Sequence, residues 1–137
     1  MKDLTTIETF IQKRHILTLS TQADTEVESC SAFYAYEPLL HSFVIASDEK
    51  TNHIQNALQN PKVALNIFLD TKEVGRIEGV QIKATLHPLQ NATLKQSYFK
   101  RFPYAVAMQP TLWEIKPYWM KYTSNRLGFG KKLIVEL

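Results

Sequence analysis

The stretch IASDEKTNHIQNALQNP, residues 45–61, decides the fold prediction because the local pattern changes within it. Its first residues continue an apolar strand, and the residues after the turn have helical spacing, with Ile54, Ala57 and Leu58 facing inward. Pro61 ends this helix. The stretch therefore predicts a strand, a polar turn and a short helix in succession.

The turn at the start of this helix carries cations where the helix dipole disfavours positive charge. A helix N-terminus presents unpaired N–H groups, so it is a ready site for a phosphate. Lys50 and Thr51 would add a charged donor and a hydroxyl donor, and Ser47 and His53 lie beside them. Two interpretations stay open: an anion-binding turn, or a solvated turn in which Ser47 or Asp48 merely caps the helix.

Before this stretch, the pattern predicts a helix and a hairpin. An N-terminal helix is indicated by an apolar stripe and by the capping-box spacing of Thr5 and Glu8. Apolar and polar residues then alternate over 15–22 and again over 27–37, which is typical of a β-hairpin. A third strand is expected over 41–47.

After this stretch, the pattern predicts more strands and one more helix. Residues 62–70 are nearly all apolar, so we expect a strand buried on both faces. A long strand follows over 76–89, in which Gly79 indicates a bulge or the close approach of another group. A helix over Ala92–Phe102, a strand or strand pair over 111–125 and a glycine turn before a last apolar strand complete the chain.

The alternation of about six strands with three helices limits the fold class. A doubly wound parallel sheet would need a crossover helix for each strand pair, which this order does not provide. An antiparallel barrel with helices at its ends fits better.

Composition indicates one globular domain over residues 1–137, with 45% hydrophobic and 21% charged residues. The net charge of +3 favours anionic partners only weakly, because 13 acidic residues lie among scattered cations. This scatter argues against a nucleic-acid partner, and no apolar run approaches the ~20 residues of a membrane helix. With no signal peptide, we expect a cytoplasmic protein. Its histidines show no metal-ligand spacing, so no metal site is expected.

Four segments, read in order, carry a resemblance to a known superfamily. They are ILTLST (16–21), SAFYAY (31–36), FVIASDEKTNHIQNALQNPKVALNI (43–67) and IEGVQIKATL (77–86). Together they resemble the FMN-binding split barrels related to pyridoxamine-5′-phosphate oxidase. The chain is most similar to a small group of bacterial members with an EKTxH helix entry and the motifs RFP, WEI and LGFGKK.

The resemblance implies a mainly β, α+β fold: a six- to seven-stranded antiparallel split β-barrel with about three helices. It also implies a homodimer with FMN in grooves at the subunit interface. The phosphate would be held by the helix-entry turn, and the ring and ribityl chain by the strand after residue 30 and by the long fifth strand. Residues near the C-terminus of the partner chain would close the pocket. The implied cofactor-binding residues are Ser31, Ala32, Phe33, Ser47, Lys50, Thr51, His53, Gln81, Trp113 and Lys131, with Lys121 and Asn125 as further candidates from the C-terminal part.

Two positions depart from the superfamily pattern. The spacing to Asn60 and Pro61 leaves open whether Lys50 or His53 is the main phosphate contact, and Glu78 stands where the most similar members have arginine. The implied function is an FMN-dependent oxidoreductase of unknown substrate, with NAD(P)H as a candidate reductant. The alternative is a non-enzymatic module that binds or senses FMN or haem. No catalytic residue is assigned, because a flavin itself supplies the reactive group.

Overall fold

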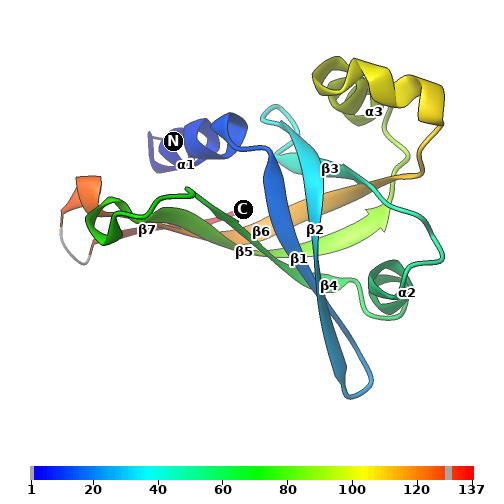
Figure 1. Ribbon diagram of the computed structural model, residues 1–137, viewed down its shortest axis with the longest axis horizontal. Helices are drawn as coiled ribbons and strands as arrows, with labels where there is room; N and C mark the ends of the chain where they lie inside the picture. The colour runs from blue at the N-terminus through cyan, green and yellow to red at the C-terminus, as the bar shows by residue number, and fades with distance from the viewer. Residues whose placement is uncertain (1, 129–130) are drawn as a thin grey trace.

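The computed structural model describes residues 2–128 and 131–137, which form seven strands, three α-helices and three short 3-10 helices (Figure 1). Phe129 and Gly130 of the predicted glycine turn lie outside the described residues. The elements are α1 (Lys2–Lys13), β1 (Ile16–Ala23), β2 (Glu26–Glu37), β3 (Ser42–Ala46), α2 (Asn52–Gln59), β4 (Lys62–Phe68), η1 (Val74–Arg76), β5 (Glu78–Pro88), α3 (Ala92–Arg101), η2 (Pro103–Met108), β6 (Leu112–Ser124), η3 (Asn125–Leu127) and β7 (Lys132–Glu136).

The strands form a closed antiparallel sheet with one additional strand. Their order is β3-β2-β1-β4-β5-β6-β7, and β3 also pairs with β6. This last pairing closes six strands into a barrel and leaves β7 beside β6. The predicted α+β fold with a seven-stranded antiparallel split barrel is therefore confirmed.

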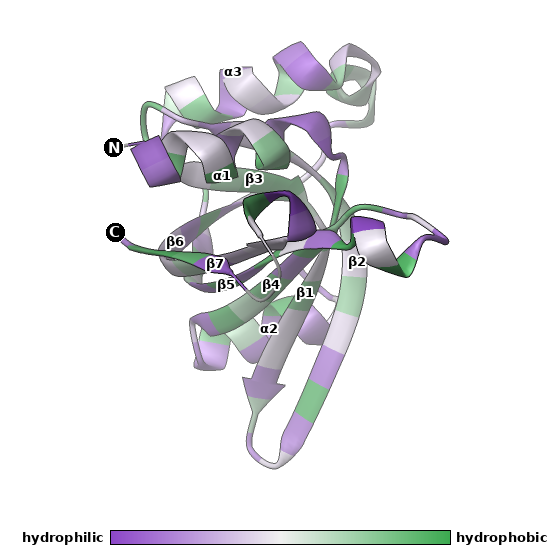
Figure 2. Ribbon diagram, turned by 90° about the vertical axis from the view of Figure 1, so that its left-hand side faces the viewer, coloured by the Kyte–Doolittle hydropathy of each residue, from purple (hydrophilic) through white to green (hydrophobic). Residues whose placement is uncertain are grey.

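The barrel core is built from alternate residues of the strands and from two helices. Hydrophilic and hydrophobic residues alternate along β2, as its banded colouring in Figure 2 shows. α1 and α2 lie on opposite sides of the barrel in Figure 1 and bury residues in the same core. α3 instead packs on the outside of β2 and β3, where Leu94, Tyr98 and Phe102 join a second apolar cluster.

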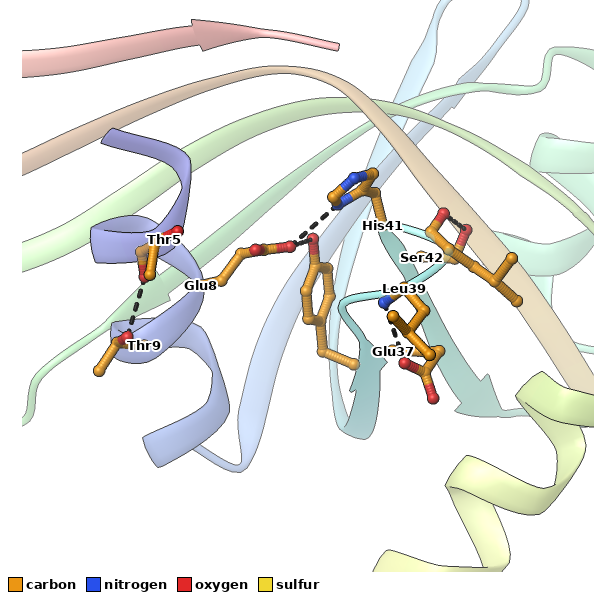
Figure 3. A network of polar contacts seen from close by, with 9 residues as sticks. Thr5, Glu8, Thr9, Glu37, Leu39, His41 and Ser42 are labelled. Carbon is orange, nitrogen blue, oxygen red and sulfur yellow. Dashed lines mark hydrogen bonds and ion pairs between the residues drawn. The ribbon is translucent and has the colours of Figure 1, made fainter. Parts of the chain in front are cut away.

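The start of α1 differs from the prediction. The helix already includes Lys2, so Thr5 lies inside it and the predicted capping box is wrong. Glu8 is instead turned toward the barrel, where it accepts a hydrogen bond from the Tyr36 hydroxyl at 2.6 Å and lies 3.0 Å from His41 Nδ1 (Figure 3). Its carboxylate therefore ties the first helix to β2 and to the turn before β3.

The predicted double burial of the fourth strand is wrong. Along β4, inward Val63, Leu65 and Ile67 are buried, and the residues between them are exposed. A barrel strand has one face toward the core and one away from it, so apolar composition alone did not reveal the second face. Leu58, expected to face inward, is also 46% exposed.

At Gly79 the backbones of β5 and β4 approach each other closely, and the strand has no bulge at this residue. A Cβ at this position would lie 3.1 Å from the Ile67 carbonyl oxygen of the neighbouring strand. The irregularity between β5 and β6 lies elsewhere, because Lys83 pairs with Trp119 while Ala84 pairs with Pro117.

Candidate functional site

The turn between β3 and α2 brings the predicted phosphate-binding side chains together. Ser47 Oγ lies 2.7 Å from His53 Nε2, and Thr51 Oγ1 lies 3.2 Å from the same nitrogen. These three side chains are partly exposed, and Lys50 between them is exposed. The turn thus presents two hydroxyls, an imidazole and an ammonium group within seven residues.

Asp48 organises the turn from within. Its carboxylate accepts from the Lys50 backbone N–H at 2.8 Å. Its backbone carbonyl accepts from both the N–H and the hydroxyl of Thr51, at 3.1 and 2.8 Å. Asp48 therefore stabilises the turn rather than the helix, and the interpretation that Ser47 or Asp48 caps α2 is wrong.

Trp113 of β6 and Thr111, which precedes this strand, hold the turn from the other side. The indole N–H of Trp113 donates to the Ser47 carbonyl at 2.8 Å, and the Ser47 N–H donates to the Thr111 carbonyl at 3.0 Å. Trp113 is 4% exposed and belongs to the barrel core. Within its own chain, Trp113 therefore stabilises the turn through the hydrogen bond to Ser47.

The N-terminus of α2 is arranged to accept an anion. Thr51 is the N-cap, but its side chain makes no capping hydrogen bond, and the first turn contains no acidic residue. The N–H groups at the start of a helix have no partners within the helix, and they carry partial positive charge. With the side chains around them, they form a donor set that suits a phosphate.

His53 is biased toward its neutral form. Burial lowers the pKa of the imidazole, and the carboxylate of Glu28 offsets this effect only in part. A bound anion would favour the protonated form, because opposite charge nearby stabilises an imidazolium. His53 would therefore link the binding of an anion at this turn to pH.

We expect His53 to titrate below the ordinary value of about 6.5 in the ligand-free protein. Between the folded and unfolded pKa values, the unfolded chain binds a proton that the folded chain does not, so stability decreases as the pH falls below 6.5. NMR titration of the imidazole measures the pKa. Comparison of melting curves with His53→Gln isolates its contribution, since the variant should lose less stability on acidification. A His53 pKa at or above 6.5 would contradict this expectation.

A second group of polar residues forms one row across the outer face of the barrel. Directly paired residues of neighbouring strands point to the same face of a sheet. The row runs through consecutive pairs from β2 to β6: Ser31, Thr18, Asn66, Gln81 and Lys121. Three predicted site residues far apart in sequence, Ser31, Gln81 and Lys121, therefore share one exposed or half-exposed face.

A hollow of ≈ 300 Å³ lies on this outer face beside Gln81. Asn66 and Lys83 line it, and Lys83 Nζ lies 4.7 Å from the centre of the Trp119 ring. A planar ligand placed here would meet amide donors and acceptors at its edge.

The residues of β2 are divided between the two faces. Ser31 and Phe33 point outward, and Phe33 is 53% exposed with its ring edge against Phe102. Ala32 points inward and packs against the barrel core. A ligand on the outer face can thus contact Ser31 and Phe33 by their side chains, and Ala32 by its backbone.

Two of the C-terminal candidates, Asn125 in η3 and Lys131 just before β7, belong to the end of the molecule opposite α2 (Figure 1). Asn125 donates to the Gly75 carbonyl at 2.9 Å, and Lys131 is exposed beside Gly128. Within one chain they do not meet the turn at 47–53. Closure of the pocket by these residues involves a second copy and stays a prediction.

Sequence reasoning missed Thr18 and Asn66 as contributors to this site and assigned Asp48 a different role, that of a helix cap. The role of Asp48 in the turn could have been found, since an Asp that bonds a backbone N–H two residues later is a common turn signal. Thr18 and Asn66 could not have been found without the register that places them between Ser31 and Gln81.

Two further properties concern the described residues. Over 2–128 and 131–137, no three His, Cys, Asp or Glu side chains gather closely enough to hold a metal ion. None of the helices formed by these residues is both long and apolar enough to span a membrane.

Sequence comparison identifies bacterial relatives over almost the whole chain. A UPF0306 protein from Klebsiella pneumoniae is 38% identical over 136 residues, covering 97% of this chain and 92% of the relative. The UPF0306 protein YhbP from Escherichia coli O157:H7 is 35% identical over 137 residues, covering 98% and 93%. No family model matches the chain.

Solved structures share the fold at low sequence identity. A NimC/NimA family protein from Clostridium acetobutylicum has a TM-score of 0.75 at 12% identity, covering 99% of this chain and 93% of that chain. A heme-binding protein from Mycobacterium smegmatis has a TM-score of 0.74 at 12% identity, covering 90% and 53%. An FAD-binding protein from Mesorhizobium loti has a TM-score of 0.72 at 10% identity, covering 85% and 89%.

Proposed function

Because this chain belongs to the UPF0306 family and folds as a split barrel, we propose that it is a homodimeric FMN-binding protein of the pyridoxamine-5′-phosphate-oxidase-like superfamily. The observation that carries this proposal is the donor set at the start of α2. It combines helix N–H groups, two hydroxyls, an imidazole and an ammonium group around a turn that is already fixed by Asp48 and Trp113.

The turn would hold the FMN phosphate. Lys50 supplies a full positive charge, and the hydroxyls of Ser47 and Thr51 would donate to phosphate oxygens, for which the Thr51 hydroxyl would turn away from the Asp48 carbonyl. Charge-assisted hydrogen bonds to phosphate oxygens are about twice as strong as neutral ones. Both cations contribute, Lys50 as a permanent charge and His53 as one that depends on protonation.

The outer face would hold the ring system. Ser31 and Gln81 lie in one lateral row, so a planar group along this face can meet both. Gly79 keeps β5 close to β4 near the same row. The ring would therefore be positioned by hydrogen bonds at its edge.

A second copy of the chain would cover the same face. Large apolar side chains remain exposed on it, and a soluble monomer rarely leaves such a patch uncovered. They are Ile16 at 50%, Phe33 at 53%, Phe68 at 62% and Ile134 at 56% exposure. A homodimer built on this face would let Lys121, Asn125 or Lys131 of one copy reach the cofactor of the other.

Bound FMN would supply reversible electron transfer, with NAD(P)H as the candidate reductant. The side chains of this protein would orient the flavin, form hydrogen bonds at its edge and limit access of water and oxygen. We therefore propose an FMN-dependent oxidoreductase activity that needs no catalytic triad. The similarity to heme-binding structures favours a second candidate, a non-enzymatic module for flavin or haem.

A spectrum of the purified protein tests the proposal. We expect visible flavin absorbance, or its appearance when FMN is added to the ligand-free protein, with one FMN per chain. Bleaching of this absorbance by NADH or NADPH under anaerobic conditions would support the oxidoreductase. A bound flavin that neither compound reduces would support the binding module, and a haem Soret band with no flavin binding would replace FMN by haem.

A further inference from the structure

A second groove gathers four basic side chains at the end of the molecule opposite α2. Residues of α1, Arg76 of η1 and Arg126 of η3 line it, and its volume is ≈ 470 Å³. The basic residues that line it are Lys13, Arg14, Arg76 and Arg126. We call it the basic groove; none of its lining residues belongs to the turn at 47–53 or to the lateral row.

The acidic residues near the basic groove leave an excess of positive charge. Glu78 is the one acidic side chain among the described residues that line it. It is 8% exposed, accepts a hydrogen bond from the Tyr122 hydroxyl and pairs with Arg126 Nη2 at 2.7 Å. Its charge is therefore used to hold Arg126, whose remaining N–H groups can serve a ligand.

Arg76 is more weakly engaged. Its partner Glu73 lies at 3.2 Å, but the two side chains are 70% and 64% exposed. Exposed ion pairs of this kind exchange readily for other partners. Lys13 adds a further exposed cation at the end of α1.

Arg14 has a donor without a partner. Its guanidinium lies over the Phe10 ring, 5.4 Å from the ring centre. Its Nε is buried and makes no hydrogen bond. Among residues 2–128 and 131–137, every other buried side-chain nitrogen or oxygen has a hydrogen-bond partner. Arg14 therefore contributes its positive charge to the groove, whereas its buried Nε is not open to a ligand in this arrangement of the side chain.

Thr6 and Thr9 of α1 do not offer free hydroxyl donors to a ligand in the basic groove. The hydroxyls of Thr6 and Thr9 donate to the backbone carbonyls of Lys2 and Thr5, at 3.1 and 2.9 Å. Recognition of an anion would therefore depend on the basic side chains. The planar guanidinium of arginine can donate two parallel hydrogen bonds to the paired oxygens of a carboxylate or phosphate.

We propose that the basic groove binds a small organic anion with at least two negative charges, of the phosphate-ester or polycarboxylate class. Within one chain the basic groove is separate from the proposed cofactor turn, and in the proposed homodimer Asn125, next to Arg126 of the groove, would approach the cofactor of the other copy. It gives the protein a place to bind an anionic substrate or effector that the flavin site by itself does not supply.

Calorimetric titration of the full-length protein with pyrophosphate and with citrate, before and after saturation with FMN, tests this proposal. We expect saturable binding of at least one probe, weakened at least tenfold in Lys13→Ala/Arg76→Ala, whose changed side chains are exposed. Binding of pyrophosphate alone would assign a phosphate ligand, and binding of citrate alone a polycarboxylate.

A matched variant removes two exposed lysines elsewhere, Lys95→Ala/Lys116→Ala, and should keep the affinity of the wild type. The turn variant Lys50→Ala/Thr51→Ala should also keep it, even if it loses FMN. Absence of saturable binding, equal affinity in Lys13→Ala/Arg76→Ala, or loss of the probe in the turn variant would overturn the proposal. Because each titration is made both without FMN and with it, a failure to bind the anion and a failure to bind FMN are measured separately.

Discussion

Lys50→Ala combined with Thr51→Ala should raise the Kd for FMN by about 100-fold while leaving the barrel folded. Each side chain would lose a contact to phosphate worth about 1.5 kcal/mol, and a total near 3 kcal/mol corresponds to about two powers of ten in affinity. The fold should tolerate the change because Lys50 is exposed, the Thr51 hydroxyl does not cap α2, and the Thr51 N–H still donates to the Asp48 carbonyl after the hydroxyl is removed. Fluorescence titration with FMN measures the affinity, and a melting curve checks the fold.

Thr93→Ala/Lys95→Ala is a matched control, because it removes the same two residue types from the exposed surface of α3. It should bind FMN as the wild type does. The single variants Lys50→Ala and His53→Gln, compared at pH 6 and pH 8, separate the two cations. The loss caused by His53→Gln should be greater at the lower pH, whereas that of Lys50→Ala should be similar at both. Unchanged affinity in the double variant would mean that the cations of this turn are ordinary surface residues.

Phe68→Lys should dissociate the homodimer and abolish tight binding of FMN. Phe68 is 62% exposed in one chain, on the outer face that also carries Asn66. Burial of a phenylalanine side chain in an interface contributes about 1.5–3 kcal/mol, and a lysine there would have to lose its hydration without a partner. A twofold interface contains the change twice, so the effect on the dimer is doubled.

Light scattering after size-exclusion chromatography measures this effect. The wild type should have twice the chain mass of 15.8 kDa, and Phe68→Lys should have the mass of one chain. Leu39→Lys provides a control, because Leu39 is 85% exposed in the turn before β3, away from the outer face. It should remain a dimer and bind FMN. A monomeric wild type at micromolar concentration, or a Phe68→Lys dimer that still binds FMN, would contradict the proposed interface.

Local pattern was sufficient for most of the elements of this protein. The apolar stripe of α1, the alternation in β1 and β2, and the strand-turn-helix order around residues 45–61 all depend on neighbours within a few residues. The polar and cationic character of the turn at 47–53 could be predicted for the same reason. Local pattern failed where one face of an element had to be distinguished from the other, as for Leu58 and for β4.

The remaining features depend on pairing between distant segments. β3 meets β6 to close the barrel, and the register of five strands places Ser31, Gln81 and Lys121 in one row. The contact of Trp113 with Ser47 and the pairing of Glu78 with Arg126 likewise join residues 66 and 48 positions apart. The periodicity of apolar residues along the chain does not reveal contacts between such distant residues.

The sequence by itself therefore determined that residues 45–61 form a strand, a cationic turn and a helix, because propensity and spacing act locally. Only the tertiary structure decided that Asp48 and Trp113 fix the turn, that His53 lies between Ser47 and Thr51, and that Arg14, Arg76 and Arg126 share a groove. These arrangements arise when barrel closure brings distant residues together, and a linear pattern does not contain that distance information.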